Sequence, residues 1–146
     1  MKTLPALLLA TAVLTPLLST TALAEDSNQH PGKIERLGAG TRFSDAVKHD
    51  QLVYLSGVIA QDRTQDIEGQ TRQILDQIEQ TLHKAGSSKS RILTATVWLA
   101  DMKDFDGMNQ VWEHWFEKGA APARATVQAK LARSDARVEI MVVAAQ

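Results

Sequence analysis

The sequence predicts an α+β fold in which two helices cover one face of a single β-sheet. Two segments with apolar residues at helical spacing alternate with five β-rich segments, in the order β-β-α-β-α-β-β. The chain has 146 residues, of which 44% are hydrophobic and 23% charged, so its length and composition suit one globular domain. Two helices packed on one sheet form a two-layer sandwich.

The first 24 residues have the features of a signal peptide. Lys2 precedes an apolar run of roughly 15 residues, which is shorter than the about 20 residues that span a bilayer. The segment ends in Ala-Leu-Ala at residues 22–24, a pattern that signal peptidase accepts. We expect cleavage after Ala24 and export, with the bacterial periplasm as the expected location; an uncleaved anchor is the alternative. Residues 25–36 are then a flexible polar lead-in and residues 37–146 the single domain.

Two predicted strands open the domain. Residues 42–48 alternate loosely, and residues 52–60 are rich in β-forming side chains, with a turn at residues 49–51 between them. Gly57 stands within the second segment, where a strand usually carries a side chain. Such a glycine often marks a bulge or a close approach of a ligand to the backbone.

The first helix is predicted over residues 67–85. Asp66 can cap its start and Gly86 can end it. Its apolar face consists of Ile67, Ile74, Leu75, Ile78, Leu82 and Ala85. A strand at residues 91–100 follows, and its apolar face is expected to consist of Leu93, Ala95, Val97 and Leu99.

The second helix is expected to begin after the cap residue Asp104 and to end at Gly119. Its apolar stripe consists of Phe105, Met108, Trp112, Trp115 and Phe116. We interpret its tryptophans as core or subunit contacts rather than as a cofactor site. The last two strands, at residues 124–131 and 137–145, are joined by a turn at residues 133–136.

Composition and motifs exclude several kinds of chemistry. The chain has no cysteine, which excludes disulfides, thiolate catalysis and cysteine-ligated zinc. Its 16 basic and 17 acidic residues give a net charge of -1, unlike the basic excess of most nucleic-acid-binding proteins. The four histidines do not lie at metal-ligand spacing with another ligand, so we expect no metal site. The sequence has no glycine-rich phosphate loop and no serine-hydrolase elbow.

Arg124 and Glu139 are the candidate functional residues. Arg124 follows Pro122 at the start of a strand, where a fixed guanidinium can bind a carboxylate through two parallel hydrogen bonds. Glu139 lies within an apolar strand, and burial disfavours the charged form of a carboxylate, which suits proton transfer near neutral pH. A structural ion pair with a nearby arginine or lysine is the alternative reading of Glu139.

A simple hairpin would separate these two side chains. With a turn at residues 134–135, Glu139 would face Lys130, and Arg124 would lie six residues further along the strand, roughly 20 Å away. One small ligand could not contact both groups within that hairpin. Either the strand pairing is irregular, or the two groups meet across a subunit boundary.

Four motifs lie in order along the chain. They are Leu-Ser-Gly at residues 55–57, Asp-Phe-x-x-Met-Asn at 104–109, Pro-Ala-Arg-Ala-Thr-Val at 122–127 and Val-Glu-Ile at 138–140. Together they resemble the Rid family, the reactive intermediate deaminases, also called the RidA or YjgF family. The resemblance covers residues 42–145 and implies a chorismate-mutase-like fold, a homotrimer with clefts between subunits, and activity without a metal or organic cofactor.

Proteins of this family hydrolyse reactive imines and enamines derived from amino acids to 2-keto acids and ammonia. The resemblance therefore implies a 2-iminobutanoate/2-iminopropanoate-type deaminase that acts on 2-aminoacrylate-type intermediates. It also implies that Arg124 grips the substrate carboxylate and that Glu139 positions and deprotonates the attacking water. By the same resemblance, Ser56 and Gly57 line the pocket, and Asn109 shapes it from the second helix.

Two matched positions differ from the residues usual in the family. Thr126 stands where many relatives have cysteine, but it is the main chain at this position that contacts the substrate in relatives. Phe43 stands thirteen residues before Ser56, where relatives often have tyrosine; phenylalanine keeps the ring but cannot donate a hydrogen bond. If that hydroxyl orients the imine or the water, this protein should be slower or differently selective.

Two other functions stay open. The expected export favours a non-catalytic trimeric module that binds a small molecule or a protein, because most imine-generating enzymes are expected in the cytoplasm. RNA cleavage has also been attached to the family, but the near-neutral charge argues against it here. We expect a small imino or enamino acid as partner, no nucleic acid, and no membrane contact after signal cleavage.

Overall fold

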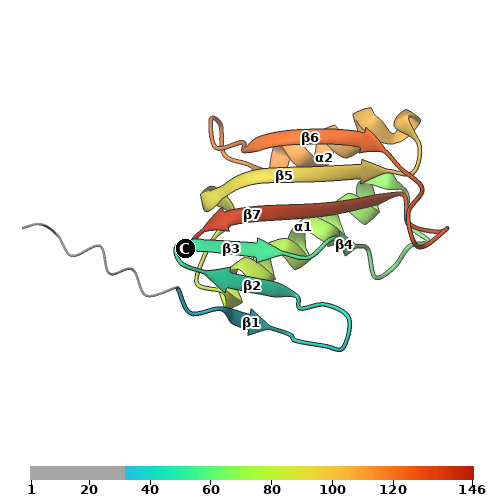
Figure 1. The fold of residues 1–146 in the computed structure, drawn as a ribbon. Helices are drawn as coiled ribbons and strands as arrows, with labels where there is room; N and C mark the ends of the chain where they lie inside the picture. Colours follow the sequence, from blue (N-terminus) through green and yellow to red (C-terminus); the bar gives the residue numbers. More distant parts are fainter. Residues whose placement is uncertain (1–31) are drawn as a thin grey trace, which may run out of the picture. The chain divides into compact units, whose positions relative to one another are not determined.

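Residues 32–146 are described by the computed structural model, in which two helices cover one face of a single sheet (Figure 1). The predicted α+β two-layer class is confirmed. The signal peptide expected at residues 1–24, its cleavage site and the first part of the lead-in lie outside the described residues. Among residues 32–146, no helix is long and apolar enough to cross a membrane.

The sheet has the strand order β1-β2-β3-β7-β5-β6, and β4 pairs with β7 beyond the end of β3. All neighbouring strands are antiparallel except β5 and β6. The strands are β1 (Glu35–Leu37), β2 (Ala46–His49), β3 (Leu52–Leu55), β4 (Val58–Ile59), β5 (Ile92–Leu99), β6 (Ala123–Gln128) and β7 (Val138–Ala145). The helices are α1 (Ile67–Lys84) and α2 (Phe105–Trp115), and 3-10 turns span Lys89–Arg91 and Met102–Asp104. In Figure 1 both helices lie behind the sheet, α2 near β5 and β6 and α1 near β7.

The chain enters the sheet differently from the prediction. Strand β1 includes two residues that the sequence assigns to the lead-in, and it pairs with β2. The strand predicted at residues 42–48 is confined to Ala46–His49. Residues 40–43 instead form a turn, in which the Gly40 amide donates to the Phe43 carbonyl at 2.9 Å. Phe43 therefore lies in the loop before β2.

The strand predicted at residues 52–60 is broken at Ser56 and Gly57. The Ser56 amide donates to the Asp45 carbonyl at 3.1 Å. Strand β3 pairs Tyr54 with Val143 of β7, whereas β4 pairs Val58 with Ile140, so the register shifts by one residue across the break. Gly57 thus marks an irregular point in the strand, as its position predicts.

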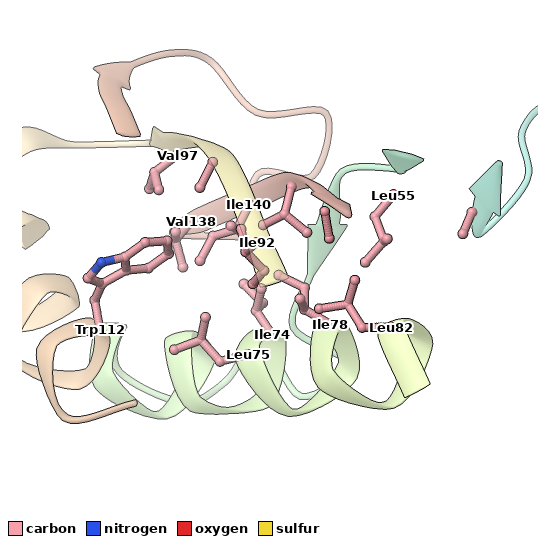
Figure 2. Close-up of a cluster of buried hydrophobic side chains, with 14 of the residues drawn as sticks. Leu55, Ile74, Leu75, Ile78, Leu82, Ile92, Val97, Trp112, Val138 and Ile140 are labelled. Atoms are coloured by element: carbon pink, nitrogen blue, oxygen red, sulfur yellow. The ribbon is translucent and has the colours of Figure 1, made fainter. Parts of the chain in front are cut away.

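Helix α1 begins and ends where the sequence predicts. The Asp66 carboxylate caps it by accepting a hydrogen bond from the Gly69 amide at 2.8 Å. Gly86 follows the helix with a φ of 80°, a left-handed conformation that glycine adopts without strain. Figure 2 shows the inner face of the helix packed against the sheet, where Ile74, Leu75, Ile78 and Leu82 are buried. Each such side chain contributes about 1.5–3 kcal/mol on burial, so this face holds the helix in place.

Strand β5 departs from the predicted alternation at its first residues. Its pairing with β7 shifts between Ile92 and Thr94. As a result Ile92 is buried and Leu93 is 48% exposed, although the sequence places Leu93 on the apolar face. From Ala95 onward the alternate residues are buried as predicted.

Helix α2 ends at Trp115, before the predicted stop at Gly119, because Phe116 takes an extended conformation. Asp104 stands at its N-cap position but makes no capping hydrogen bond. Its carboxylate instead accepts two hydrogen bonds from Arg137, from Nε to Oδ2 at 3.0 Å and from Nη2 to Oδ1 at 2.7 Å. This ion pair fastens the start of α2 to the start of β7.

The hairpin predicted for the last two strands is wrong, because β5 lies between β6 and β7. Strand β6 runs parallel to β5, and β7 runs antiparallel to β5 on the other side. Parallel neighbours need a crossover connection, and α2 supplies it. The strands that are consecutive in the chain are therefore not neighbours in the sheet.

The two faces of the sheet have different surroundings. Alternate residues of β7 from Val138 to Ala144 are buried under the helices, and we call this side the helix face. The other side, which we call the open face, is covered by no helix within residues 32–146. It carries Glu139 and Met141 of β7 and the exposed apolar side chains Tyr54 and Val127. An exposed apolar sheet face of this kind indicates an interaction surface.

Candidate functional site

Arg124 lies on the helix face of β6 and is held by α2. Its Nη2 donates a hydrogen bond to Oδ1 of Asn109 at 2.7 Å, and its Nη1 lies 3.8 Å from Sδ of Met108. Its guanidinium carbon lies 4.8 Å from the centroid of the Trp112 ring, a cation–π contact. Residues 109 and 112 are three apart on the helix and residues 108 and 112 are four apart, so one side of α2 presents all three to Arg124.

The Arg124 guanidinium retains donors for a ligand. An arginine has five N–H donors, and the contacts with Asn109 and Met108 use one from each terminal nitrogen. None of the ion pairs among residues 32–146 includes Arg124. Burial lowers the pKa of Arg124 from its ordinary value, and the nearby charge of Glu113 acts in the opposite direction. Arginine remains protonated at neutral pH, so the site holds a fixed cation with unused donors.

Glu139 lies on the open face of β7, directly beside Gly57. A Cβ at position 57 would lie 2.1 Å from Oε1 of Glu139, so only glycine leaves room for this carboxylate. In register, Glu139 pairs with Ile59 of β4 and with Trp98 of β5. It belongs to none of the ion pairs found in the described part of the chain. The structural ion pair considered from the sequence is therefore not formed within residues 32–146.

A cleft of about 370 Å³ opens beside Gly57. Three residues that the sequence predicts for the pocket line it, namely Phe43, Ser56 and Gly57. The facing side of α1 contributes Gln77, Gln80, Thr81 and Lys84. Phe43 is 64% exposed, so its ring is available to a ligand or to another subunit. Glu139 lies against Gly57 but does not line this cleft.

Thr126 belongs to the Arg124 side of the molecule. It lies two residues after Arg124 and on the same face of β6. Its Oγ1 is buried and has no hydrogen-bond partner among the described residues. The predicted site residues thus form two groups: Arg124, Asn109 and Thr126 beside α2, and Phe43, Ser56, Gly57 and Glu139 around the strand break.

Arg124 and Glu139 lie on opposite faces of the sheet. Arg124 pairs in register with Ala95 of β5, and Glu139 pairs with Trp98 of the same strand. Successive strand residues alternate between faces, so positions 95 and 98 point to opposite sides. One small ligand within a single chain cannot contact both side chains. The hairpin from which the sequence predicts their separation is absent, and the two side chains are instead separated by the sheet.

No metal centre accompanies either group. Residues 32–146 contain no group of three or more histidine, aspartate or glutamate side chains placed to hold a metal ion. His114 bonds through Nδ1 to the Gln110 carbonyl at 2.5 Å, and His49 lies 3.4 Å from the Asp50 carboxylate. These histidines make local contacts on the surface.

The sequence places Met108 and Trp112 in the apolar stripe of the second helix and assigns neither of them a role at the site. Trp112 is indeed a core residue, 5% exposed and packed on Phe116 at a ring distance of 5.0 Å. Its ring also makes the cation–π contact with the guanidinium of Arg124, a role that the sequence does not predict. The available signal was its spacing of three residues from Asn109, which places both on one side of α2.

Comparisons with known proteins cover this whole domain. The sequence model of a family described as Endoribonuclease L-PSP matches residues 33–146. The chain is 46% identical over 112 residues to the RutC family protein YoaB of Escherichia coli, covering 77% of this chain and 97% of that protein. It is 35% identical over 108 residues to the 3-aminoacrylate deaminase RutC of Acinetobacter baylyi, covering 70% and 85%. A crystal structure of a YjgF family member from Neisseria meningitidis is similar with a TM-score of 0.78 and 39% identity, covering 80% and 98%.

Proposed function

This chain belongs to the Rid (YjgF) family, whose sequence model is described as Endoribonuclease L-PSP, and from that premise we propose that it hydrolyses reactive 2-imino and enamino acids to 2-keto acids and ammonia. The observation that carries the proposal is the fixed guanidinium of Arg124, which has unused donors and no carboxylate partner within residues 32–146. The similar protein named 3-aminoacrylate deaminase supports an enamine substrate. The proposed substrates are 2-iminopropanoate and 2-iminobutanoate, formed from 2-aminoacrylate-type intermediates.

The proposal includes an active site completed between subunits of a homotrimer. The opposite orientation of Arg124 and Glu139 supports it, because a second copy must bring the complementary group to either one. The apolar open face supports it as well, since Tyr54 and Val127 are exposed in the single chain. In a cyclic trimer, each subunit contributes Arg124 to the site it shares with one neighbour and Glu139 to the site it shares with the other neighbour.

In the proposed reaction, water adds to the carbon of the protonated imine. Arg124 binds the substrate carboxylate through two parallel hydrogen bonds and thereby orients the imine carbon. Glu139 accepts a proton from the water as the new C–O bond forms. Glu139 returns that proton to the amino group of the resulting carbinolamine. The C–N bond then breaks and ammonia leaves, while the hydroxyl group gives its proton to Glu139, which passes it to solvent, and becomes the carbonyl of the 2-keto acid. Water supplies the oxygen and no electrons are transferred, so the reaction needs no redox cofactor.

The other predicted residues have supporting roles in this proposal. Asn109 holds the guanidinium through its 2.7 Å hydrogen bond. Ser56 and Gly57 line the substrate site in this proposal, and Gly57 gives the Glu139 carboxylate its space. The main chain at Thr126 lies beside Arg124 and contacts the substrate. Phe43 packs on the substrate without donating a hydrogen bond.

We also propose that the protein acts after export, in the bacterial periplasm. The signal-like segment at residues 1–24 supports this location. The substrates would then come from imine-forming reactions outside the cytoplasm, such as the oxidation of amino acids.

Imine hydrolysis by residues 25–146 tests the proposed function. An amino-acid oxidase generates 2-imino acids in the presence of semicarbazide, and the diversion from semicarbazone to free keto acid is followed. We expect acceleration by the wild type, loss of activity in Arg124→Ala and a loss of about 100-fold or more in Glu139→Gln. Arg72→Ala is the matched control, because Arg72 is exposed on α1 and its ion-pair partner among residues 32–146 is Glu68.

Equal, negligible rates for all these proteins across several amino acids would overturn the deaminase proposal. Ligand protection without turnover would then identify a non-catalytic binding module of the same fold. Cleavage of RNA by the same preparation, lost in Glu139→Gln, would point to the third function. We expect RNA to stay intact, because the chain carries a net charge of -1.

A further inference from the structure

Three contacts from one side of α2 restrict the Arg124 guanidinium. Asn109 and Met108 approach the two terminal nitrogens, at 2.7 Å and 3.8 Å. The guanidinium carbon lies over the Trp112 ring, 4.8 Å from its centroid. An arginine side chain has many rotamers, and contacts with the edge alone leave the tilt of the plane open. A flat ring beneath the group is the contact that restricts such a tilt, and among the three contacts this is Trp112.

The Trp112 ring is itself immobilised. It is 5% exposed, and its centroid lies 5.0 Å from the Phe116 ring. The Phe116 ring in turn packs edge-on against Trp115 at 4.8 Å. Figure 2 shows Trp112 projecting from α2 into the core of the domain. The guanidinium therefore rests on a rigid surface whose position is set by the packing of α2.

From these contacts we propose that Trp112 is a positioning residue, which sets the plane of the Arg124 guanidinium so that its remaining N–H donors meet the substrate carboxylate. The inference rests on the proposed function, in which Arg124 binds that carboxylate. Two parallel hydrogen bonds require the two planar groups to be nearly coplanar, so the tilt of the guanidinium controls affinity. Burial lowers the pKa of Arg124, and the electron-rich ring face partly compensates the cation for its lost hydration.

A role in the core alone predicts something different. Trp112 fills space in the core, so any smaller residue lowers the stability of the fold. If that were its entire contribution, substitution would lower the melting temperature and the active fraction but leave the KM of the folded enzyme unchanged. A positioning role raises KM, because the carboxylate clamp holds the substrate and the transition state alike.

The test compares Trp112→Tyr, Trp112→Phe and Trp112→Leu in the purified protein. Trp115→Phe is the matched control, because Trp115 packs on the same Phe116 ring, but the cation over its own ring is Lys89 and not Arg124. The readouts are KM and kcat for imine hydrolysis, and the Kd for 2-oxobutanoate, a keto-acid product, by calorimetry. Circular dichroism establishes that each variant is folded, and the tyrosine and phenylalanine variants suffice if the leucine variant is not.

We expect KM and Kd to rise in the order Trp, Tyr, Phe, Leu, by roughly tenfold from the first to the last, with kcat changed less than about threefold. The tyrosine variant should recover most of the affinity. In an Arg124→Ala background the Trp112 substitutions should no longer change Kd, because the group they position is absent. Trp115→Phe should leave all three constants unchanged.

The two levels of inference fail separately. Normal KM and Kd in folded Trp112→Phe and Trp112→Leu overturn the positioning role and leave the deaminase proposal intact. A wild type that binds 2-oxobutanoate but does not hydrolyse imines overturns the deaminase proposal, and the Kd series then decides the role of Trp112. A wild type that neither binds the keto acid nor turns over imines overturns both.

Discussion

The carboxylate of Glu139 occupies the space that a side chain at Gly57 would need, since a Cβ there would lie 2.1 Å from Oε1. The two residues come from different strands, β7 and the break between β3 and β4. The one-residue change of register across that break brings Gly57 against Glu139. A glycine in a strand and a glutamate in an apolar strand are thus two parts of one local arrangement.

Gly57→Ala should lower kcat for imine hydrolysis by about 100-fold, because a displacement of about 1 Å of a catalytic group costs that much. The added methyl group forces Glu139 away from its present position. The backbone of Gly57 has no positive φ, so the fold itself should tolerate alanine. Rates and thermal melts of the variant separate the two effects.

Glu139→Asp supplies the control for this substitution. Its shorter side chain withdraws the carboxylate from position 57, so adding Gly57→Ala to Glu139→Asp should cost much less than adding it to the wild type. Full activity in Gly57→Ala alone would show that the present position of Glu139 is not the one used in the reaction.

Phe43→Tyr should raise kcat by roughly tenfold, since an oriented donor at a reacting group is worth about 10²-fold or more in a closed site. Phe43 is 64% exposed, and the cleft beside it is lined by polar groups, so the added hydroxyl meets no steric obstacle within the chain. Stability should be unchanged for the same reason. Steady-state kinetics on two imino acids check the prediction, and an unaltered kcat would exclude a role for the hydroxyl.

The ion pair between Arg137 and Asp104 should respond asymmetrically to substitution. The Asp104 side chain is 7% exposed and the Arg137 side chain 40% exposed. Arg137→Met leaves a buried carboxylate without its partner and should cost about 3 kcal/mol of unfolding free energy. Asp104→Asn leaves an arginine that can reach solvent and should cost about 1 kcal/mol.

Urea unfolding at pH 7 measures both effects. Lys103→Met is the matched control, because Lys103 pairs with Asp101 on the surface with 69% of its side chain exposed. It should change the stability by less than about 0.5 kcal/mol. Equal losses for the two members of the buried pair would contradict the asymmetry.

The sequence predicts the ends of α1 well, because these ends depend on interactions between residues that are close together in the chain. Asp66 and Gly86 bound α1 through a hydrogen bond and a backbone conformation that depend only on neighbouring residues. Asp104 has the same chemical type as Asp66 but does not cap α2. The competing partner, Arg137, lies 33 residues away and is visible only once the strands are assembled.

The strand pairing could not be predicted from the sequence in the same way. Residues 124–145 have the pattern of a hairpin, yet β5 separates the two strands because α2 works as a crossover. The difference affects the site: a simple hairpin would place Arg124 and Glu139 along one pair of strands, whereas the two side chains lie on opposite faces of the sheet. The contact between Arg124 and Trp112 depends on the same crossover, which places α2 over β6.

The loop that precedes α1 should contribute to the loss of stability at acid pH. The Thr64 hydroxyl donates to Asp62 at 2.6 Å and the Gln65 amide donates at 2.9 Å, and these bonds lower the pKa of Asp62 from its ordinary value of 3.8. Because the folded pKa lies below the unfolded one, the stabilisation is fully present above about pH 4 and is lost as the pH falls through the folded pKa. Asp62→Asn should therefore be less stable than the wild type at pH 7 and should lose less stability on acidification.

Urea midpoints between pH 7 and pH 2 test this sign. Asp76→Asn is the comparison, since Asp76 is exposed on α1 and forms no ion pair within residues 32–146. Its urea midpoint should fall with decreasing pH as steeply as that of the wild type. If the urea midpoint of Asp62→Asn falls with pH as steeply as that of the wild type, the hydrogen bonds in this loop do not contribute to acid unfolding.

Mixed trimers test whether the two halves of the site come from different chains. Arg124→Ala and Glu139→Gln subunits are each inactive alone in the proposed mechanism. The two variants are refolded together in equal amounts. A site is then active when an Arg124→Ala subunit supplies its intact Glu139 and the neighbouring Glu139→Gln subunit supplies its intact Arg124. Random assembly produces that combination in about a quarter of the sites, so about a quarter of wild-type activity should return. If each site were built within one chain, no activity would return, because neither variant chain holds both groups. We expect activity to return, because Arg124 and Glu139 lie on opposite faces of the sheet within one chain.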